Sequence, residues 1–185
     1  DVRVHPLPSV PAAIAGASGT LLGDQVLLIG GLETALGPPL DRVWRLDLVT
    51  EGGWQAVDPI PGPGRIDAVA GTHRSVAYVV GGIDRQDQPL LDVWRYDPAL
   101  NAWHACSPLP RPMRSPCESL VHVGWDMLAV IDEGEDLLVY HPNTDRWSRR
   151  DRPDLGPIGL LTSRGVVPLA DIDAPVDGET VRSEE

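Results

Sequence analysis

The sequence has no apolar run long enough to form a membrane-spanning helix. Within its 185 residues, no stretch approaches the ~18 uninterrupted apolar positions that such a helix needs. The composition, 42% hydrophobic and 23% charged, is typical of a soluble globular protein with one sizeable core. The chain begins at Asp1 rather than with a methionine, so we expect a processed or excised segment.

Clusters of basic residues are missing as well. The 15 Lys and Arg are outnumbered by 27 Asp and Glu, which gives a net charge of −12. No basic patch dense enough to hold nucleic-acid phosphates is present, so the sequence argues against a nucleic-acid partner. Six aspartates fall in separate predicted turns, which indicates solvated loops rather than one anionic patch: Asp24, Asp41, Asp58, Asp67, Asp84 and Asp97.

Residues that would build a metal site or a disulfide framework are few. The five histidines are isolated, whereas a metal site needs several ligands at set spacing, so no metal is predicted. The two cysteines, Cys106 and Cys117, flank the loop SPLPRPMRSP. A bridge between them requires Cα atoms within roughly 7 Å. Two free thiols are the simpler expectation, because two cysteines alone are not a disulfide framework.

Motifs of the common enzyme classes are also absent. The sequence contains no nucleophile elbow, P-loop, HExxH or dinucleotide-binding glycine motif. The segment GASG at residues 16–19 precedes a predicted strand rather than a helix, which disfavours a phosphate loop.

What the sequence does contain is a repeated unit of about fifty residues, and its most complete copy includes residues 76–110. The pair Gly30-Gly31 recurs 51 residues later as Gly81-Gly82, and Trp44 recurs 50 residues later as Trp94. Three further tryptophans open the last predicted strand of each unit, at intervals of 49 and 44 residues: Trp54, Trp103 and Trp147. A period near 50 with paired glycines and spaced aromatics is typical of kelch repeats.

The local patterns within each unit predict an all-β blade of four antiparallel strands. VLLIGG and VAYVVGG are short apolar runs, as expected for inner strands buried on both faces. We expect the glycines that end them to adopt positive φ and to let an aromatic side chain approach closely. VWRLDL and VWRYDP alternate apolar with charged residues, and each tryptophan is expected to cover the contact between adjacent blades. An ordinary sandwich is the alternative, and helices are hardly indicated.

These signals predict a kelch β-propeller segment over residues 1–173, followed by a polar, acidic tail over 174–185. The predicted blades cover residues 14–61, 65–110 and 115–152, with a partial blade at 156–173. VRVHPLPSVP, at the start, resembles the closing strand and exit of a preceding unit.

About three and a half blades leave an open arc with unpaired strand edges. We therefore expect the missing blades to come from a longer chain or from a partner such as a second copy in a homodimer. A four-bladed ring that uses residues 2–5 as an outer strand is a third arrangement.

Candidate functional residues lie where innermost strands begin and in the loops over the central channel. Arginine can grip a carboxylate bidentately, and a neighbouring carboxylate can move protons. The alternative role for each is a turn or inter-blade salt bridge. The candidates for substrate binding are Arg65, Asp67, Arg111, Arg114 and Glu118, and the candidate catalytic residue is Asp171.

The order of segments resembles the N-acetylneuraminate epimerase (sialic acid mutarotase) family and related bacterial cyclically permuted mutarotases. The matching segments are WQAVDPIPGPGRIDAVAG, YVVGGID, LLDVWRYDPALNAWHACSPLPRP, a weak third blade, and RGVVPLADIDAP. The resemblance covers nearly the whole chain and about four of the six blades in that family.

The resemblance implies a cofactor-free isomerase that interconverts sugar anomers, in a protein that can be periplasmic or secreted. In that family a glutamate acts as acid and base, and an arginine six residues later binds the substrate carboxylate. The glutamate position falls on Asp171, and the arginine position falls on Asp177, which reverses the charge. A substrate carboxylate would meet negative charge there unless another arginine, such as Arg65, substitutes.

Two functions from different classes therefore follow from the sequence. One is a mutarotase-like isomerase acting on a sialic acid or a similar sugar. The other is a non-catalytic kelch module that binds a protein or a glycan through its loops. A fragment of a copper-dependent protein similar to galactose oxidase is a weaker third, because no Tyr/Cys/His ligand set is evident.

Overall fold

The structure is a computed structural model, and it describes residues 6–12, 14–50, 52–113, 119–122, 128–131, 137–150, 159–162 and 165–168. Two compact units divide the chain, Asp1–Arg149 and Arg150–Glu185. The predicted outer strand at residues 2–5 and the predicted tail at 174–185 lie outside the described residues.

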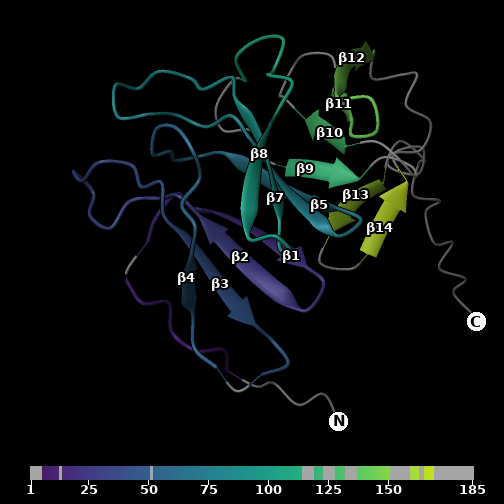
Figure 1. The fold of residues 1–185 in the computed structure, drawn as a ribbon. Helices are drawn as coiled ribbons and strands as arrows, with labels where there is room; N and C mark the ends of the chain where they lie inside the picture. Colours follow the sequence, from purple (N-terminus) through teal and green to yellow (C-terminus); the bar gives the residue numbers. More distant parts are fainter. Residues whose placement is uncertain are drawn as a thin grey trace, which may run out of the picture. The chain divides into compact units, whose positions relative to one another are not determined.

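The first unit contains three four-stranded antiparallel sheets (Figure 1). In each sheet, strands that follow one another along the chain lie side by side. Blade 1 is β1 (Ser18–Leu22), β2 (Gln25–Ile29), β3 (Val43–Asp47) and β4 (Gln55–Val57). Blade 2 is β5 (Val69–His73), β6 (Val76–Val80), β7 (Val93–Asp97) and β8 (Ala102–Cys106). Blade 3 is β9 (Ser119–His122), β10 (Leu128–Ile131), β11 (Leu137–His141) and β12 (Arg146–Arg150).

The second unit contains an antiparallel hairpin, β13 (Gly159–Thr162) with β14 (Gly165–Pro168). The described residues form no α-helix, and none of their elements is a helix long and apolar enough to cross a membrane. The all-β architecture of four-stranded antiparallel blades is therefore confirmed.

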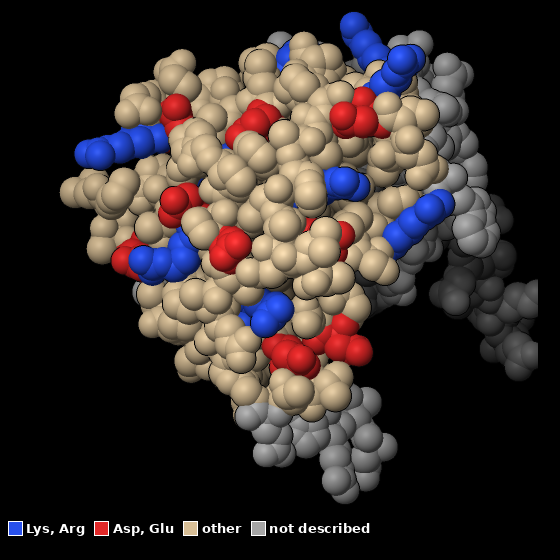
Figure 2. Space-filling model, in the orientation of Figure 1, with Lys and Arg blue, Asp and Glu red and all other residues tan. Residues whose placement is uncertain are grey.

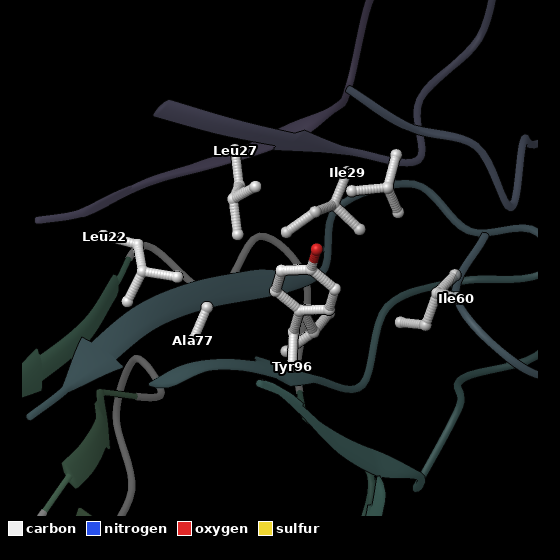
Figure 3. Packing of buried hydrophobic residues seen from close by; sticks show 8 residues of the cluster. Leu22, Leu27, Ile29, Ile60, Ala77 and Tyr96 are labelled. Atoms are coloured by element: carbon white, nitrogen blue, oxygen red, sulfur yellow. The ribbon is translucent and has the colours of Figure 1, made fainter. Parts of the chain in front are cut away.

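The core lies between the blades, where β-strands present apolar side chains to the neighbouring sheet. Leu27 and Ile29 of β2 pack in one buried cluster with Ala77 and Tyr96 of blade 2, whose side chains point toward them (Figure 3). Val80 of β6 lies instead in a second cluster, shared with blade 3. Strand β6 is thus buried on both faces, as its unbroken apolar run predicts.

Strand β7 shows the predicted alternation of side chains. Trp94 and Tyr96 pack in the cluster shared with blade 1, whereas Val93 packs with Leu138 of blade 3. Arg95 lies between them in the sequence and is exposed. Successive residues of a strand point to opposite faces. Strand β7 therefore contributes side chains both to the contact with blade 1 and to the contact with blade 3.

The paired glycines adopt positive φ, as predicted, and neighbouring segments of the chain pack closely against them. Their φ angles are 71° and 94° at Gly30 and Gly31, and 61° and 105° at Gly81 and Gly82. A Cβ atom on Gly30 would lie 2.4 Å from the carbonyl oxygen of Arg65. The three nearest atoms at each of the four positions belong to the backbone or to non-aromatic side chains. The expected approach of an aromatic side chain stays a prediction.

A tryptophan at the start of each outer strand joins its blade to the preceding segment. The indole N–H of Trp103 donates to the carbonyl of Asp58 at 3.0 Å, and that of Trp147 donates to Ser107 at 2.8 Å. Each acceptor is the first residue after the outer strand of the preceding blade. Trp54 of blade 1 donates in the same way to Pro8 at 3.0 Å. Pro8 therefore occupies the place that Asp58 and Ser107 occupy in later repeats, as expected for the exit of a preceding unit.

In blades 2 and 3, a tyrosine of the third strand contacts this tryptophan and is hydrogen-bonded to the turn before the outer strand. Tyr96 packs against Trp103 with ring centroids 5.0 Å apart and ring planes tilted by 46°, and its hydroxyl donates to Asn101 Oδ1 at 2.7 Å. In blade 3, the hydroxyl of Tyr140 donates to Asp145 Oδ1 at 2.6 Å. Asn101 and Asp145 both lie at positive φ, which asparagine and aspartate tolerate better than most residues.

Asp145 also binds blade 2. Its Oδ1 accepts the backbone N–H of Ser107 at 2.7 Å, and its carbonyl accepts the hydroxyl of the same serine at 2.7 Å. Burial acts to raise the pKa of Asp145, but the hydrogen bonds from Tyr140 and Ser107 outweigh it, so the net pKa is lowered.

We expect Trp103→Phe to lower the free energy of unfolding by about 0.5–1.5 kcal/mol, because ring packing is kept while the hydrogen bond to Asp58 is lost. Urea unfolding would measure this change. Leu100→Ala, at a turn position that is 67% exposed, serves as the control and should change stability by less than about 0.5 kcal/mol. Equal losses in the two variants would contradict a stabilising role for the indole N–H.

We expect Asp145→Asn to make the free energy of unfolding fall less steeply as the pH is lowered into the acid range. Since the folded pKa is lowered from the ordinary 3.8, the ionised form stabilises the protein above that value. This stabilisation is lost as pH falls below 3.8 through the folded pKa. Unfolding measured across this window should show a smaller loss for the variant, by up to about 1 kcal/mol because the group is largely solvent-screened. Curves parallel to the wild type would disprove this assignment.

Candidate functional site

The blades have two chemically different ends. The loop end comprises the connections at residues 30–42 and 81–92 and the blade entries and exits at 14–17, 58–68 and 107–113. The turn end comprises the hairpin turns at residues 23–24, 48–54, 74–75 and 98–101. All three predicted site residues that the structure describes, Arg65, Asp67 and Arg111, lie at the loop end.

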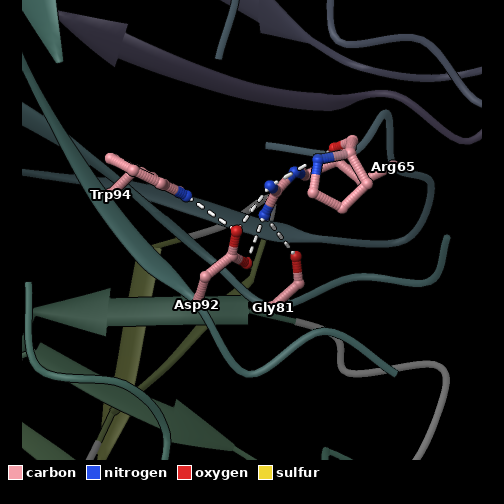
Figure 4. A network of polar contacts seen from close by, with 5 residues as sticks. Arg65, Gly81, Asp92 and Trp94 are labelled. Carbon is pink, nitrogen blue, oxygen red and sulfur yellow. Dashed lines mark hydrogen bonds and ion pairs between the residues drawn. The ribbon is translucent and has the colours of Figure 1, made fainter. Parts of the chain in front are cut away.

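Arg65 is fully buried at the entry to blade 2. Its Nη1 and Nη2 atoms donate to the two carboxylate oxygens of Asp92 at 2.7 and 2.8 Å, and Nη1 also donates to the carbonyl of Gly81 at 3.0 Å (Figure 4). Asp92 accepts a further hydrogen bond from Trp94 Nε1 at 2.7 Å. A substrate carboxylate would have to displace Asp92 to reach this guanidinium.

The backbone of Arg65 is also engaged. Its N–H donates to Leu40 at 3.0 Å, and its carbonyl accepts from Gly31 at 2.9 Å. Both partners belong to the β2–β3 connection of blade 1, so Arg65 joins the loop ends of two blades. The Arg65–Asp92 salt bridge lies within blade 2, whereas the backbone of Arg65 makes the contact with blade 1. The sequence left a salt-bridge role open as the alternative to substrate binding, and the binding role of Arg65 stays a prediction.

Blade 1 has no counterpart of this network. The residues that correspond to Arg65 and Asp92 are Ile14 and Arg42. Arg42 pairs with Glu33 and lies 5.7 Å from the centroid of the Trp44 ring. Among the described residues, the buried Nε1 of Trp44 has no acceptor, whereas the corresponding Trp94 has Asp92. The charge network therefore distinguishes blade 2 from blade 1.

Asp67 is the exposed carboxylate nearest to this network in the chain. Its φ is 52°, and its backbone N–H donates to the carbonyl of Gly16 in blade 1 at 3.1 Å. Gly16, 51 residues earlier, has the corresponding place and a φ of 64°. Glycine and aspartate both tolerate this conformation, so the backbone geometry at this position is the same in the two blades.

The other predicted residues are only partly accounted for. Arg111 is half-buried in the exit of blade 2, where its Nη1 donates to the carbonyl of Pro112 at 3.2 Å. Arg114, Glu118 and Asp171 lie outside the described residues, as do Asp177 and Cys117. Cys106 is a free thiol whose pKa is raised by burial. The substrate-binding roles of Arg111, Arg114 and Glu118 and the catalytic role of Asp171 stay predictions.

Charges of both signs are interspersed on the face shown in Figure 2, in line with the solvated loops that the sequence predicts. Within the described ranges, no group of three or more His, Cys, Asp or Glu residues could hold a metal ion.

Asp92 is the residue of this end that the sequence did not single out. It lies 27 positions from Arg65, and its counterpart in blade 1 is an arginine, so neither proximity in the chain nor the repeat pattern reveals the pair. The one sequence signal for Asp92 is the neighbouring Trp94, a tryptophan at a repeated position whose indole N–H needs a hydrogen-bond acceptor.

Four-stranded antiparallel sheets joined by repeated tryptophan contacts define the molecule as a set of kelch-type β-propeller blades. The family model of the Kelch motif matches residues 64–110, which include blade 2 and the Arg65–Asp92 pair. A solved structure titled "Structure of YjhT" superposes with a TM-score of 0.65 at 20% identity, over 80% of this chain and 54% of that one. At this identity the likeness shows the fold.

The chain also resembles N-acetylneuraminate epimerases. It is 32% identical over 114 residues to the protein of that name from Haemophilus influenzae (strain PittEE), and 34% identical over 103 residues to the one from Yersinia enterocolitica serotype O:8 / biotype 1B (strain NCTC 13174 / 8081). These matches cover 59% and 52% of this chain, but 28% and 25% of the two relatives. The matched segment thus corresponds to about a quarter of each relative.

We expect Asp92→Asn to lower the free energy of unfolding by about 2–4 kcal/mol, because a buried guanidinium loses its counter-charge. A double-mutant cycle with Arg65→Met, measured by urea unfolding, should give a coupling energy of about 1–3 kcal/mol. The corresponding blade 1 variant, Arg42→Gln, breaks an exposed pair and should cost less than about 1 kcal/mol. A coupling energy near zero would show that Arg65 and Asp92 do not stabilise the fold as a pair.

Proposed function

We propose that this chain is part of a mutarotase-like propeller that interconverts the anomers of a sialic acid or a similar sugar without a cofactor. The observation that carries the proposal is the match to N-acetylneuraminate epimerases over 114 residues. The Kelch motif match at residues 64–110 supports it, because that segment includes two of the predicted site residues, Arg65 and Asp67.

The reaction needs only proton transfers. A base removes the proton of the anomeric hydroxyl while an acid protonates the ring oxygen, and the ring C–O bond breaks to give the open-chain keto form. Rotation about the bond next to the carbonyl and re-closure, with the protons moving back, gives the other anomer. A positioned carboxylate can perform both transfers, and typically contributes 10²–10⁴-fold.

In this proposal Asp171 is the acid and base, and Asp67 is a second carboxylate at the loop end. Asp67 is exposed and is held at positive φ, so its side chain is accessible to a sugar. The substrate carboxylate is assigned to Arg111 and Arg114, since Arg65 is already bound bidentately by Asp92.

A second candidate is a kelch module that binds a glycan or a protein through the loop end without turnover. The burial of Arg65 favours it, because an arginine predicted for substrate binding is used to join two blades. The aspartate at position 177, where the resemblance implies an arginine, favours it too.

We expect the protein to accelerate exchange between the α and β anomers of N-acetylneuraminate, measured by NMR exchange spectroscopy. Asp171→Ala should abolish the acceleration, and Asp67→Asn should reduce it about tenfold or more. The control is Asp24→Asn, which removes an exposed carboxylate at the turn end and should leave the rate unchanged. Thermal unfolding of each variant would show that it is folded.

No acceleration by the folded wild type would overturn the mutarotase proposal. Saturable binding of the sugar without acceleration would then support the non-catalytic module. Acceleration that survives in Asp171→Ala would refute the role of that residue.

A further inference from the structure

The loop end presents a carboxylate that the blades do not use to stabilise their own turns. Three other turn aspartates each accept two backbone N–H groups at Oδ1: Asp47, Asp84 and Asp97. Within the part of the chain that the structure describes, the exposed carboxylate of Asp67 takes part in no hydrogen bond or ion pair. Its counterpart in blade 1 is Gly16, whose φ of 64° is close to the 52° of Asp67, so the backbone here does not require a carboxylate.

Gly16 lies directly against this carboxylate. Its carbonyl accepts the backbone N–H of Asp67 at 3.1 Å. The hydroxyl of Ser18 donates to the carbonyl of Ala68, so the entries of blades 1 and 2 are joined side by side. A Cβ atom on Gly16 would lie 3.5 Å from Oδ1 of Asp67 and 3.4 Å from Cβ of Ile66. A methyl group there would fill the space on the blade 1 side of the carboxylate, from which a ligand hydroxyl can otherwise approach Oδ1.

The chemistry of this position suits a sugar. A carboxylate only accepts hydrogen bonds, a sugar hydroxyl can donate one, and a hydrogen bond to a charged group is stronger than one between neutral groups. Glycine is the residue that lets a ligand come close to the backbone. We propose that Gly16 is a specificity-determining residue of the sugar site, because its missing side chain leaves room for a sugar hydroxyl to reach Asp67. This inference rests on the proposed function, since it takes the sugar as the ligand of Asp67.

The test measures binding of N-acetylneuraminate to the full chain by ¹H–¹⁵N NMR titration. Gly16→Ala should raise the dissociation constant about threefold to tenfold, because a hydrogen bond to a charged group is weakened. The matched control is Gly23→Ala at the turn end. Gly23 has a φ of 59°, and apart from its chain neighbours no atom lies within 4 Å of its Cβ position, so alanine brings the same backbone strain without a steric contact. Both variants should lower the melting temperature by a similar amount, and only Gly16→Ala should bind the sugar more weakly.

A double-mutant cycle separates an effect through Asp67 from a general effect on the fold. Asp67→Gly removes the carboxylate and places glycine, the residue of blade 1, at a positive φ that glycine adopts readily. In this background Gly16→Ala should change the dissociation constant by less than about twofold. An equal rise in both backgrounds, or an unchanged affinity in Gly16→Ala alone, would refute the role of Gly16.

Sugar binding and anomer exchange are measured separately, so the two proposals can fail separately. Binding that depends on Gly16 without accelerated exchange would overturn the mutarotase proposal and support the role of Gly16. Accelerated exchange with binding that is insensitive to Gly16→Ala would overturn the role of Gly16 alone. A folded wild type that binds no N-acetylneuraminate would sink both.

Discussion

The hydrogen bond from an outer-strand tryptophan to the carbonyl that follows the preceding outer strand is the contact on which this architecture depends. A four-stranded blade has apolar residues on both faces and cannot cover them alone. Trp103 and Trp147 each join a blade to the one before it, and Tyr96 and Tyr140 pack against these two tryptophan rings. The same contact recurs in blade 1, where Pro8 is the acceptor for Trp54.

Blade 2 differs from blade 1 in how it uses charge at the loop end. Arg65 and Asp92 form a bidentate pair in which the arginine is fully buried and the aspartate side chain is 29% exposed, whereas Arg42 and Glu33 form an exposed pair. Breaking the buried pair leaves a desolvated charge, which makes it structurally demanding in a way that a solvated pair is not. At the loop end, Asp67 is an exposed carboxylate two residues from the buried Arg65.

Much of the fold could be predicted from the sequence, and less of the candidate site. The spacing of Trp54, Trp103 and Trp147 predicts one blade contact per repeat because a large aromatic at a fixed register must meet the same neighbour each time. The positive φ of the glycine pairs follows from the residue type, but the backbone that crowds them does not. Asp92 was missed because a partner 27 residues from Arg65 is set by how two connections meet in space.

The sequence by itself determined the number and order of the described blades, the alternation of buried and exposed residues, and the resemblance to the kelch mutarotases. These properties are local and periodic, so they can be read along the chain. Only the tertiary structure decided that Arg65 is buried against Asp92 while Asp67 is exposed, two positions apart on the same strand entry. It also decided that Gly16 of blade 1 lies against the carboxylate of Asp67. Burial and contacts between blades depend on how separate blades pack, and no single repeat contains that information.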